Sequence, residues 1–138
     1  SSEITIEEKL NTFLEYYIDF LSENSYLPMF ILQGLYARPE QLKTLLESRK
    51  LVPKKLLSHL REQIKREKNL DIDPFHFYIN ILALCIFPVL AKPVIQAIFE
   101  LSNEEIQQFF SERKKVVPEF FMHALKSYEN QVKNSSHD

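Results

Sequence analysis

The stretch FHFYINILALCIFPVLA, residues 75–91, decides the fold of this 138-residue chain. Every residue in it except His76, Asn80 and Pro88 is apolar. A helix that is hydrophobic all round must be covered on every side, and a chain of this length offers little protein to cover it. We therefore expect the segment to enter a membrane, to line an internal cavity, or to pack against a second copy of the chain.

The composition predicts an all-α fold. The chain has one Gly, no Trp, 11 Phe and 6 Tyr, and it lacks the Asn-Gly type of turn that β-hairpins need. Hydrophobic content of 45% and charged content of 26% are ordinary for a globular protein. We expect one helical domain over residues 1–129, followed by a disordered tail over residues 130–138.

Three local patterns mark where helices begin. Two are capping boxes, in which side chains and backbone N–H groups at a helix start pair reciprocally. The third is an N-cap aspartate followed by proline at the first helical position. The pairs are Thr5 with Glu8, Ser102 with Glu105, and Asp73 with Pro74.

The prolines predict where helices are interrupted. We expect an amphipathic helix over residues 5–23, a second helix over residues 26–37, and a further helix that opens at Pro39. Pro88 is expected to kink or end the apolar helix, and Pro118 to kink the last one.

A membrane-spanning helix needs about 20 apolar residues. The run at 75–91 is shorter, contains His76 and Asn80, and is interrupted by Pro88. We therefore expect it to be a buried helix of a soluble protein. The single Cys85 cannot form an intrachain disulfide, and no signal peptide is visible, so a reducing, cytoplasmic location is expected.

Charge and motifs exclude several functions. A net charge of −2 and a pI near 6.1 provide no electrostatic footprint for nucleic acid. No catalytic or phosphate-binding motif is present, and we expect neither an enzyme nor a cofactor. His76 and Asn80, one helical turn apart, could bind a metal with a third ligand such as His59, but ordinary hydrogen bonding explains them better. No metal site is predicted.

Two amides lie within apolar helix faces. Asn80 has Phe77 and Ile81 as neighbours, and Gln33 lies between Phe30 and Tyr36. A buried amide needs hydrogen-bond partners, which either a neighbouring helix or a bound ligand can provide. The alternative for the aromatic residues is a plain core. The residues predicted to line an apolar ligand pocket are Phe13, Tyr17, Phe30, Gln33, Tyr36, Phe77, Asn80, Ile81 and Leu84.

The last helix is apolar on more than one side, as is the helix at 75–91. The other, one-faced helices are too short to cover both. Helical hairpins of this kind pair about a two-fold axis into a four-helix bundle, so we expect a homodimer. The residues predicted at its interface are Ile86, Val89, Phe109, Phe110, Val116, Val117, Phe120, Phe121 and Ala124.

Two segments carry a resemblance to a known family. They are YYIDFLSENSYLPMFILQGLYARPEQL (16–42) and DPFHFYINILALCIFPVLAKPVIQAIFELSNEEIQQFFSERKKVVPEFFMHAL (73–125). The second has an apolar helix, a proline break, a short helix, a polar "S.EE" and a long helix with "ER...V..F...AL". In this order of elements the chain resembles the C-terminal effector-binding and dimerisation domain of TetR-family transcriptional regulators.

The resemblance implies that the last two long helices form the dimer bundle and that the preceding helices enclose a cavity for a small, largely apolar inducer. It implies DNA binding only through the family's basic N-terminal helix-turn-helix domain, which these residues do not include. Inducer binding would then change the spacing of the DNA-binding heads. The alternative from another class is a helical dimerisation or protein-interaction module without a ligand.

Overall fold

The structure, a computed structural model, describes residues 4–24, 26–49 and 54–135, except for the side chains of residues 54–57 and 132. The described residues form seven helices and no strand, which confirms the all-α multi-helix fold. The helices are α1 (Ile6–Glu23), α2 (Leu27–Ala37), α3 (Pro39–Ser48), α4 (Lys54–Lys68), α5 (Pro74–Leu90), α6 (Lys92–Ile98) and α7 (Asn103–Ser135).

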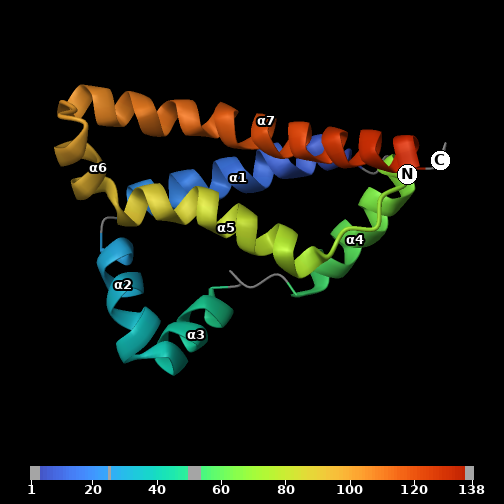
Figure 1. Ribbon diagram of the computed structural model, residues 1–138. Coiled ribbons are helices and arrows are strands. Elements are labelled where there is room, and N and C mark those ends of the chain that lie inside the picture. Colours follow the sequence, from blue (N-terminus) through green and yellow to red (C-terminus); the bar gives the residue numbers. More distant parts are fainter. Residues whose placement is uncertain (1–3, 25, 50–53, 136–138) are drawn as a thin grey trace.

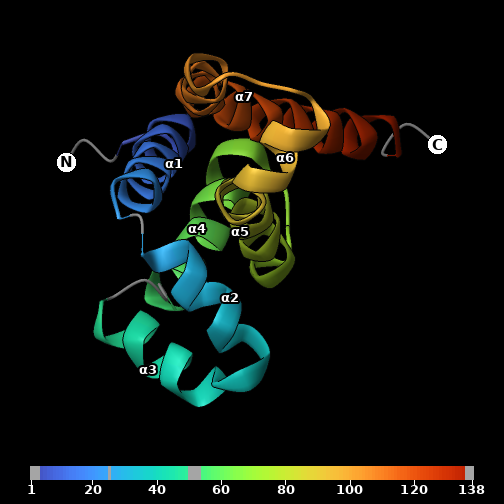
Figure 2. The ribbon, with the colours of Figure 1, turned by 90° about the vertical axis from the view of Figure 1, so that its left-hand side faces the viewer.

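The long helices α1, α5 and α7 build the body of the molecule (Figure 1). α1 packs against both of the others, while α5 and α7 diverge from their connection through α6. α4 packs against α1 and α5 at one end, and the α2–α3 hairpin lies toward the other end (Figure 1). Seen along the body, the hairpin projects away from α1, α5 and α7 (Figure 2). The main core lies among α1, α4, α5 and α7 and contains Ile6, Leu10, Leu14, Ile18, Leu60, Ile64, Leu70, Phe77, Ile81, Cys85, Val117, Phe121 and Leu125.

All three predicted helix starts are confirmed. The Thr5 Oγ1 accepts a 3.1 Å hydrogen bond from the Glu8 N–H, and the Glu8 carboxylate accepts one from the Thr5 N–H at 3.2 Å. Ser102 and Glu105 form the same reciprocal pair at 3.1 and 3.0 Å. Asp73 caps α5 by accepting a 2.8 Å bond from the backbone N–H two residues later. Local side-chain chemistry therefore sets these boundaries.

One helix end differs from the prediction, and another lies two residues beyond the proline that was expected to kink or end the helix. α7 continues as one helix through Pro118 and on to Ser135, so residues 130–135 are helical and not a tail. This part of the chain contains no Gly or Pro to stop the helix. Residues 136–138 of the predicted tail lie outside the described residues. α5 contains Pro88 and ends at Leu90, where the chain bends by 67° into α6.

Among the described residues, no single helix is both long enough and apolar enough to cross a membrane. α5 and α6 pass that test only when taken together, across the bend between them.

A buried polar cluster joins the start of α1 to α4. Gln63, only 1% exposed, donates from Nε2 to the Ile4 carbonyl at 2.7 Å and to the Glu67 carboxylate at 3.3 Å. The Lys9 ammonium donates to Gln63 Oε1. Glu67 accepts from the Ile6 N–H at 3.1 Å, so it satisfies one of the backbone donors that a helix start leaves unpaired. These bonds fix α4 to α1 where apolar packing alone would not set the register.

A second polar contact joins α5 to α7 at a proline. Pro88 has no N–H, so the Leu84 carbonyl lacks its ordinary i+4 donor within the helix. The Arg113 guanidinium supplies a replacement, with Nη2 2.7 Å from the Leu84 oxygen. The same guanidinium lies 5.8 Å from the centroid of the Phe109 ring. Burial lowers the pKa of Arg113, in keeping with its place among apolar side chains.

A double-mutant cycle tests this replacement. Arg113→Met should lower the free energy of unfolding by about 1–3 kcal/mol, because it leaves the Leu84 carbonyl unpaired. In a Pro88→Ala background the new N–H can bond that carbonyl, so the same change should cost about 1 kcal/mol less. Urea denaturation measures both values. Lys115→Met, an exposed change on the same helix, should be additive with Pro88→Ala. Additivity for Arg113 as well would contradict the replacement.

Cys85 lies in the main core at 3% exposure. Burial raises the pKa of its thiol to about 12, although the nearby Arg113 acts in the opposite direction. The thiol is therefore a small apolar core group.

Candidate functional site

An apolar cavity of about 190 Å³ lies among α1, α2, α3 and α5. Apart from three tyrosines and Arg49, its lining residues are purely apolar. The lining consists of Tyr17, Phe20, Leu21, Tyr26, Leu27, Phe30, Ile31, Leu45, Leu46, Arg49, Tyr78, Leu82 and Ile86. An enclosed apolar space with a few polar groups is typical of small-molecule sites.

The tight α2–α3 hairpin forms one wall of this cavity. Pro39 occupies the first position of α3, as predicted. Gly34 lies against Leu42, and a Cβ at Gly34 would be only 3.0 Å from the Leu42 Cβ. The single glycine of the chain thus allows the two helices to approach closely. The approach places Leu45 and Leu46 of α3 at the cavity.

Two phenols form the polar part of the cavity wall. Tyr17 of α1 and Tyr78 of α5 are hydrogen-bonded to each other. Burial is the main cause of the raised pKa of both phenols, and for Tyr17 the bond to Tyr78 adds to the increase. Both side chains therefore stay neutral at ordinary pH. The Phe13 ring packs against the Tyr17 ring, with the two centroids 4.5 Å apart, but does not itself line the cavity.

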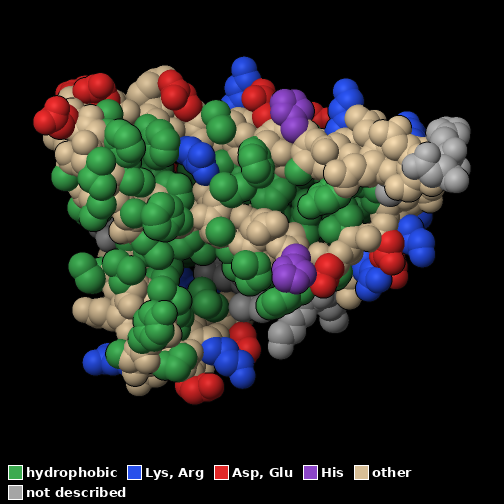
Figure 3. Space-filling model, in the orientation of Figure 1, with side chains coloured by type: hydrophobic (Ala, Val, Ile, Leu, Met, Phe, Trp, Pro, Cys, Tyr) green, Lys and Arg blue, Asp and Glu red, His purple; other side chains and the backbone are tan. Residues whose placement is uncertain are grey.

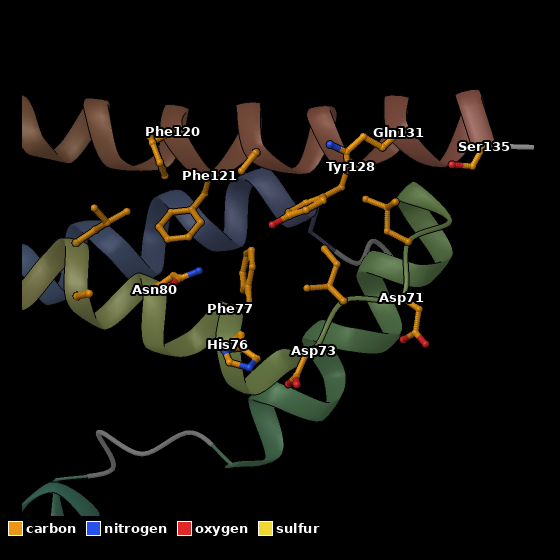
Figure 4. A pocket seen from close by; sticks show the side chains of 15 residues that line it. Asp71, Asp73, His76, Phe77, Asn80, Phe120, Phe121, Tyr128, Gln131 and Ser135 are labelled. Atoms are coloured by element: carbon orange, nitrogen blue, oxygen red, sulfur yellow. The ribbon is translucent and has the colours of Figure 1, made fainter.

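An open groove of about 980 Å³ lies between α5 and α7, where the two helices diverge (Figure 4). The Phe77 and Phe121 rings point toward each other across it, with centroids 5.3 Å apart in an edge-to-face arrangement. Polar side chains from both helices lie around these rings. They include Asp73, His76 and Asn80 on the α5 side and Tyr128, Gln131 and Ser135 on α7.

The face beside this groove is apolar and uncovered. Phe87 is 63% exposed and Phe120 is 59% exposed. Apolar side chains gather over α6 and the adjoining ends of α5 and α7, and also over α2 (Figure 3). We use the name apolar face for one set of exposed hydrophobic residues on α5, α6 with its C-cap, and α7. These residues are Phe87, Val94, Ile98, Phe99, Val116 and Phe120.

The run at 75–91 is thus covered on part of its surface only. Phe77, Tyr78, Ile81 and Cys85 are buried within the chain, while Phe87 is exposed. Helices α1 and α4 pack against one side of α5, and another side lines the cavity. The remaining side belongs to the groove and the apolar face.

The predicted pocket residues divide between the two spaces. Tyr17 and Phe30 line the cavity, whereas Phe77, Asn80 and Leu84 line the groove. Phe13 and Ile81 line neither space and pack in the main core.

The two amides and Tyr36 lie at the surface. Gln33 and Asn80 are exposed in the single chain, so neither is the buried amide that the helix faces suggested. Tyr36 is 94% exposed at the end of α2. Because α2 packs through Leu27, Ile31 and Gly34, its opposite side faces away from the cavity.

The predicted interface residues also divide. Val89, Val117 and Phe121 are buried in the chain's own core, and Ile86 lines the cavity. Phe110 packs against a small cluster around Val89, and Phe109 lies beneath Arg113. The residues that remain available to a partner are Val116 and Phe120, with Ala124 half-buried in the groove.

Tyr78 and Leu82 were missed by the sequence reasoning. With Ile86 they form an i, i+4, i+8 stripe on α5 that lines the cavity. The spacing is visible in the sequence, but in an apolar run every stripe looks alike. Arg49 was also missed, because a charged residue at the end of a short helix carries no signal for a cavity.

Within the ranges that the structure describes, no group of three His, Cys, Asp or Glu side chains is placed to hold a metal ion. His59 and His76 are both exposed. Comparison with protein-family models, curated proteins and solved structures finds no significant match to this chain.

Proposed function

We propose that this chain is the regulatory domain of a TetR-like transcriptional regulator, which binds a small, largely apolar effector and forms a homodimer. The resemblance of residues 16–42 and 73–125 to that family supports the proposal. DNA binding would come from the helix-turn-helix domain that the family carries. The chain itself would act as the ligand-sensing and dimerising part.

One observation carries the proposal: the cavity and the apolar face share helix α5. Tyr78, Leu82 and Ile86 of α5 line the cavity. Phe87 of the same helix belongs to the apolar face. A ligand in the cavity would contact one side of α5, and a second copy of the chain would cover the other side.

This arrangement suggests a mechanism by population shift. The ligand would bind more tightly to the cavity shape found in one position of α5 than to that found in another. The position of α5 would in turn change how two copies pack at the apolar face. Ligand affinity and dimer geometry would then be linked reciprocally.

A pair of variants on α5 tests whether the cavity is the ligand site. We expect 1-octanol to raise the melting temperature of the wild-type chain, because a ligand at 100 times its Kd stabilises by about 2.7 kcal/mol. Leu82→Phe replaces an aliphatic side chain that lines the cavity with a bulkier aromatic ring, and it should remove this increase. Leu84→Phe, the matched control, enlarges a groove residue on the same helix and should retain it.

The opposite results lead to other conclusions. Loss of the increase in Leu84→Phe alone would assign the ligand to the groove. A wild-type chain that dimerises but is not stabilised by any small apolar compound would be a ligand-free dimerisation module.

A further inference from the structure

One positive charge lies at the apolar cavity. Among the described residues that line it, Arg49 alone is charged. It forms the C-cap of α3, its side chain is exposed, and it has no ion-pair partner among the described residues. Its guanidinium is thus available to an anion at the edge of an otherwise apolar space.

The interior of the cavity demands an apolar occupant. Tyr17 and Tyr78 are hydrogen-bonded to each other, so one of their two hydroxyl hydrogens is already used within the cavity wall. The other interior contacts come from aliphatic and aromatic side chains such as Leu21, Ile31 and Leu82. A charged group placed there would lose its hydration without a compensating bond.

The size of the cavity limits the occupant further. Its volume of about 190 Å³ is below the ~300–1,000 Å³ of sites for drug-sized ligands. An occupant of this volume is comparable in size to a medium-chain fatty acid or a substituted benzoate.

We propose that the cavity binds a small amphiphilic monocarboxylate, with its apolar part among α1, α2, α3 and α5 and its carboxylate on Arg49. A guanidinium matches a carboxylate through two parallel N–H···O bonds, which favours this anion over a cation or a neutral alcohol. The inference rests on the proposed ligand-binding function and adds the chemical class of the ligand.

Calorimetric titration with three probes of equal chain length tests the inference. Octanoate, 1-octanol and octylamine share their apolar part and differ in charge. We expect the wild-type chain to bind octanoate at least fivefold more tightly than octylamine, and this preference should shrink as ionic strength rises.

Arg49→Gln should weaken octanoate binding about fivefold, because an exposed ion pair contributes modestly, and should leave 1-octanol binding unchanged. The matched control is Arg38→Gln, an exposed arginine between α2 and α3 that does not line the cavity. It should leave the binding of all three probes unchanged.

Different failures have different meanings. If 1-octanol binds in a manner that Leu82→Phe abolishes, but octanoate shows no dependence on Arg49, the carboxylate inference is overturned and the proposed function stands. If none of the three probes binds to the wild-type chain, both are overturned. Equal weakening by Arg38→Gln would also overturn the role of Arg49, because it would indicate a general charge effect.

Discussion

Replacing Phe121 with alanine is expected to lower the free energy of unfolding by about 3–5 kcal/mol. Phe121 is 3% exposed and packs in the core among α1, α5 and α7. Its ring meets Phe77 edge to face, so the substitution removes an aromatic pair as well as buried area. A cavity would remain, since helices fixed by the rest of the core cannot close over it. Urea denaturation measures the loss.

The adjacent Phe120 provides a matched control for this experiment. It is the same residue type one position earlier, but it belongs to the apolar face and not to the core. Both alanine variants should be compared at a concentration low enough to keep the chain monomeric. Phe120→Ala should then change stability by less than about 1 kcal/mol. Equal losses for the two variants would contradict the assignment of their faces.

The second large effect is expected for Phe120→Glu. If two copies pair through the apolar face, a glutamate there buries a carboxylate without a partner in each copy. Leaving one charge of this kind unpaired at an interface costs about 2–5 kcal/mol. The dimer Kd should therefore rise at least about 100-fold, and sedimentation velocity at micromolar concentration should show a monomer.

Tyr36→Glu is the control for that change. Tyr36 is an exposed aromatic residue on α2, outside the apolar face. Its substitution introduces the same charge and should leave the association state unchanged. A wild-type chain that sediments as a monomer, or a Phe120→Glu chain that still dimerises, would contradict the proposed interface.

Helix boundaries could be predicted from the sequence because their signals are local. The capping box at Thr5, the N-cap at Asp73 and the proline at Pro39 act through bonds within a few residues, and each lies where it was predicted. The helix over residues 130–135 was missed because the local sequence there is ambiguous. A polar composition without Gly or Pro is compatible with a solvated helix as well as with a tail.

The faces of the helices were harder to predict. α5 is apolar all round, so hydrophobic periodicity cannot say that Phe77 faces the core while Phe87 faces outward. That distinction depends on where α1, α2 and α7 pack around it. Adjacent Phe120 and Phe121 of α7 show the same limit, because both look equally apolar in the sequence.

The cavity was predictable only in part. Its aromatic members Tyr17 and Phe30 were identified because aromatic side chains on neighbouring helices suggest an apolar pocket. The α3 wall depends instead on the close approach at Gly34, which brings Leu45 and Leu46 to a site defined by other helices. A contact of this kind follows from tertiary packing and leaves no periodic trace in the chain.

The buried Cys85 also provides a chemical probe of how often the core opens locally. It is the only thiol in the chain, and burial raises its pKa to about 12, so the buried sulfur stays protonated at neutral pH. A thiol reagent can reach it only when α5 separates from α1 and α7. Its modification rate therefore reports how often that separation occurs, as amide exchange does for a backbone hydrogen bond. A ligand that holds α5 in place would lower the modification rate of Cys85 without contacting its sulfur.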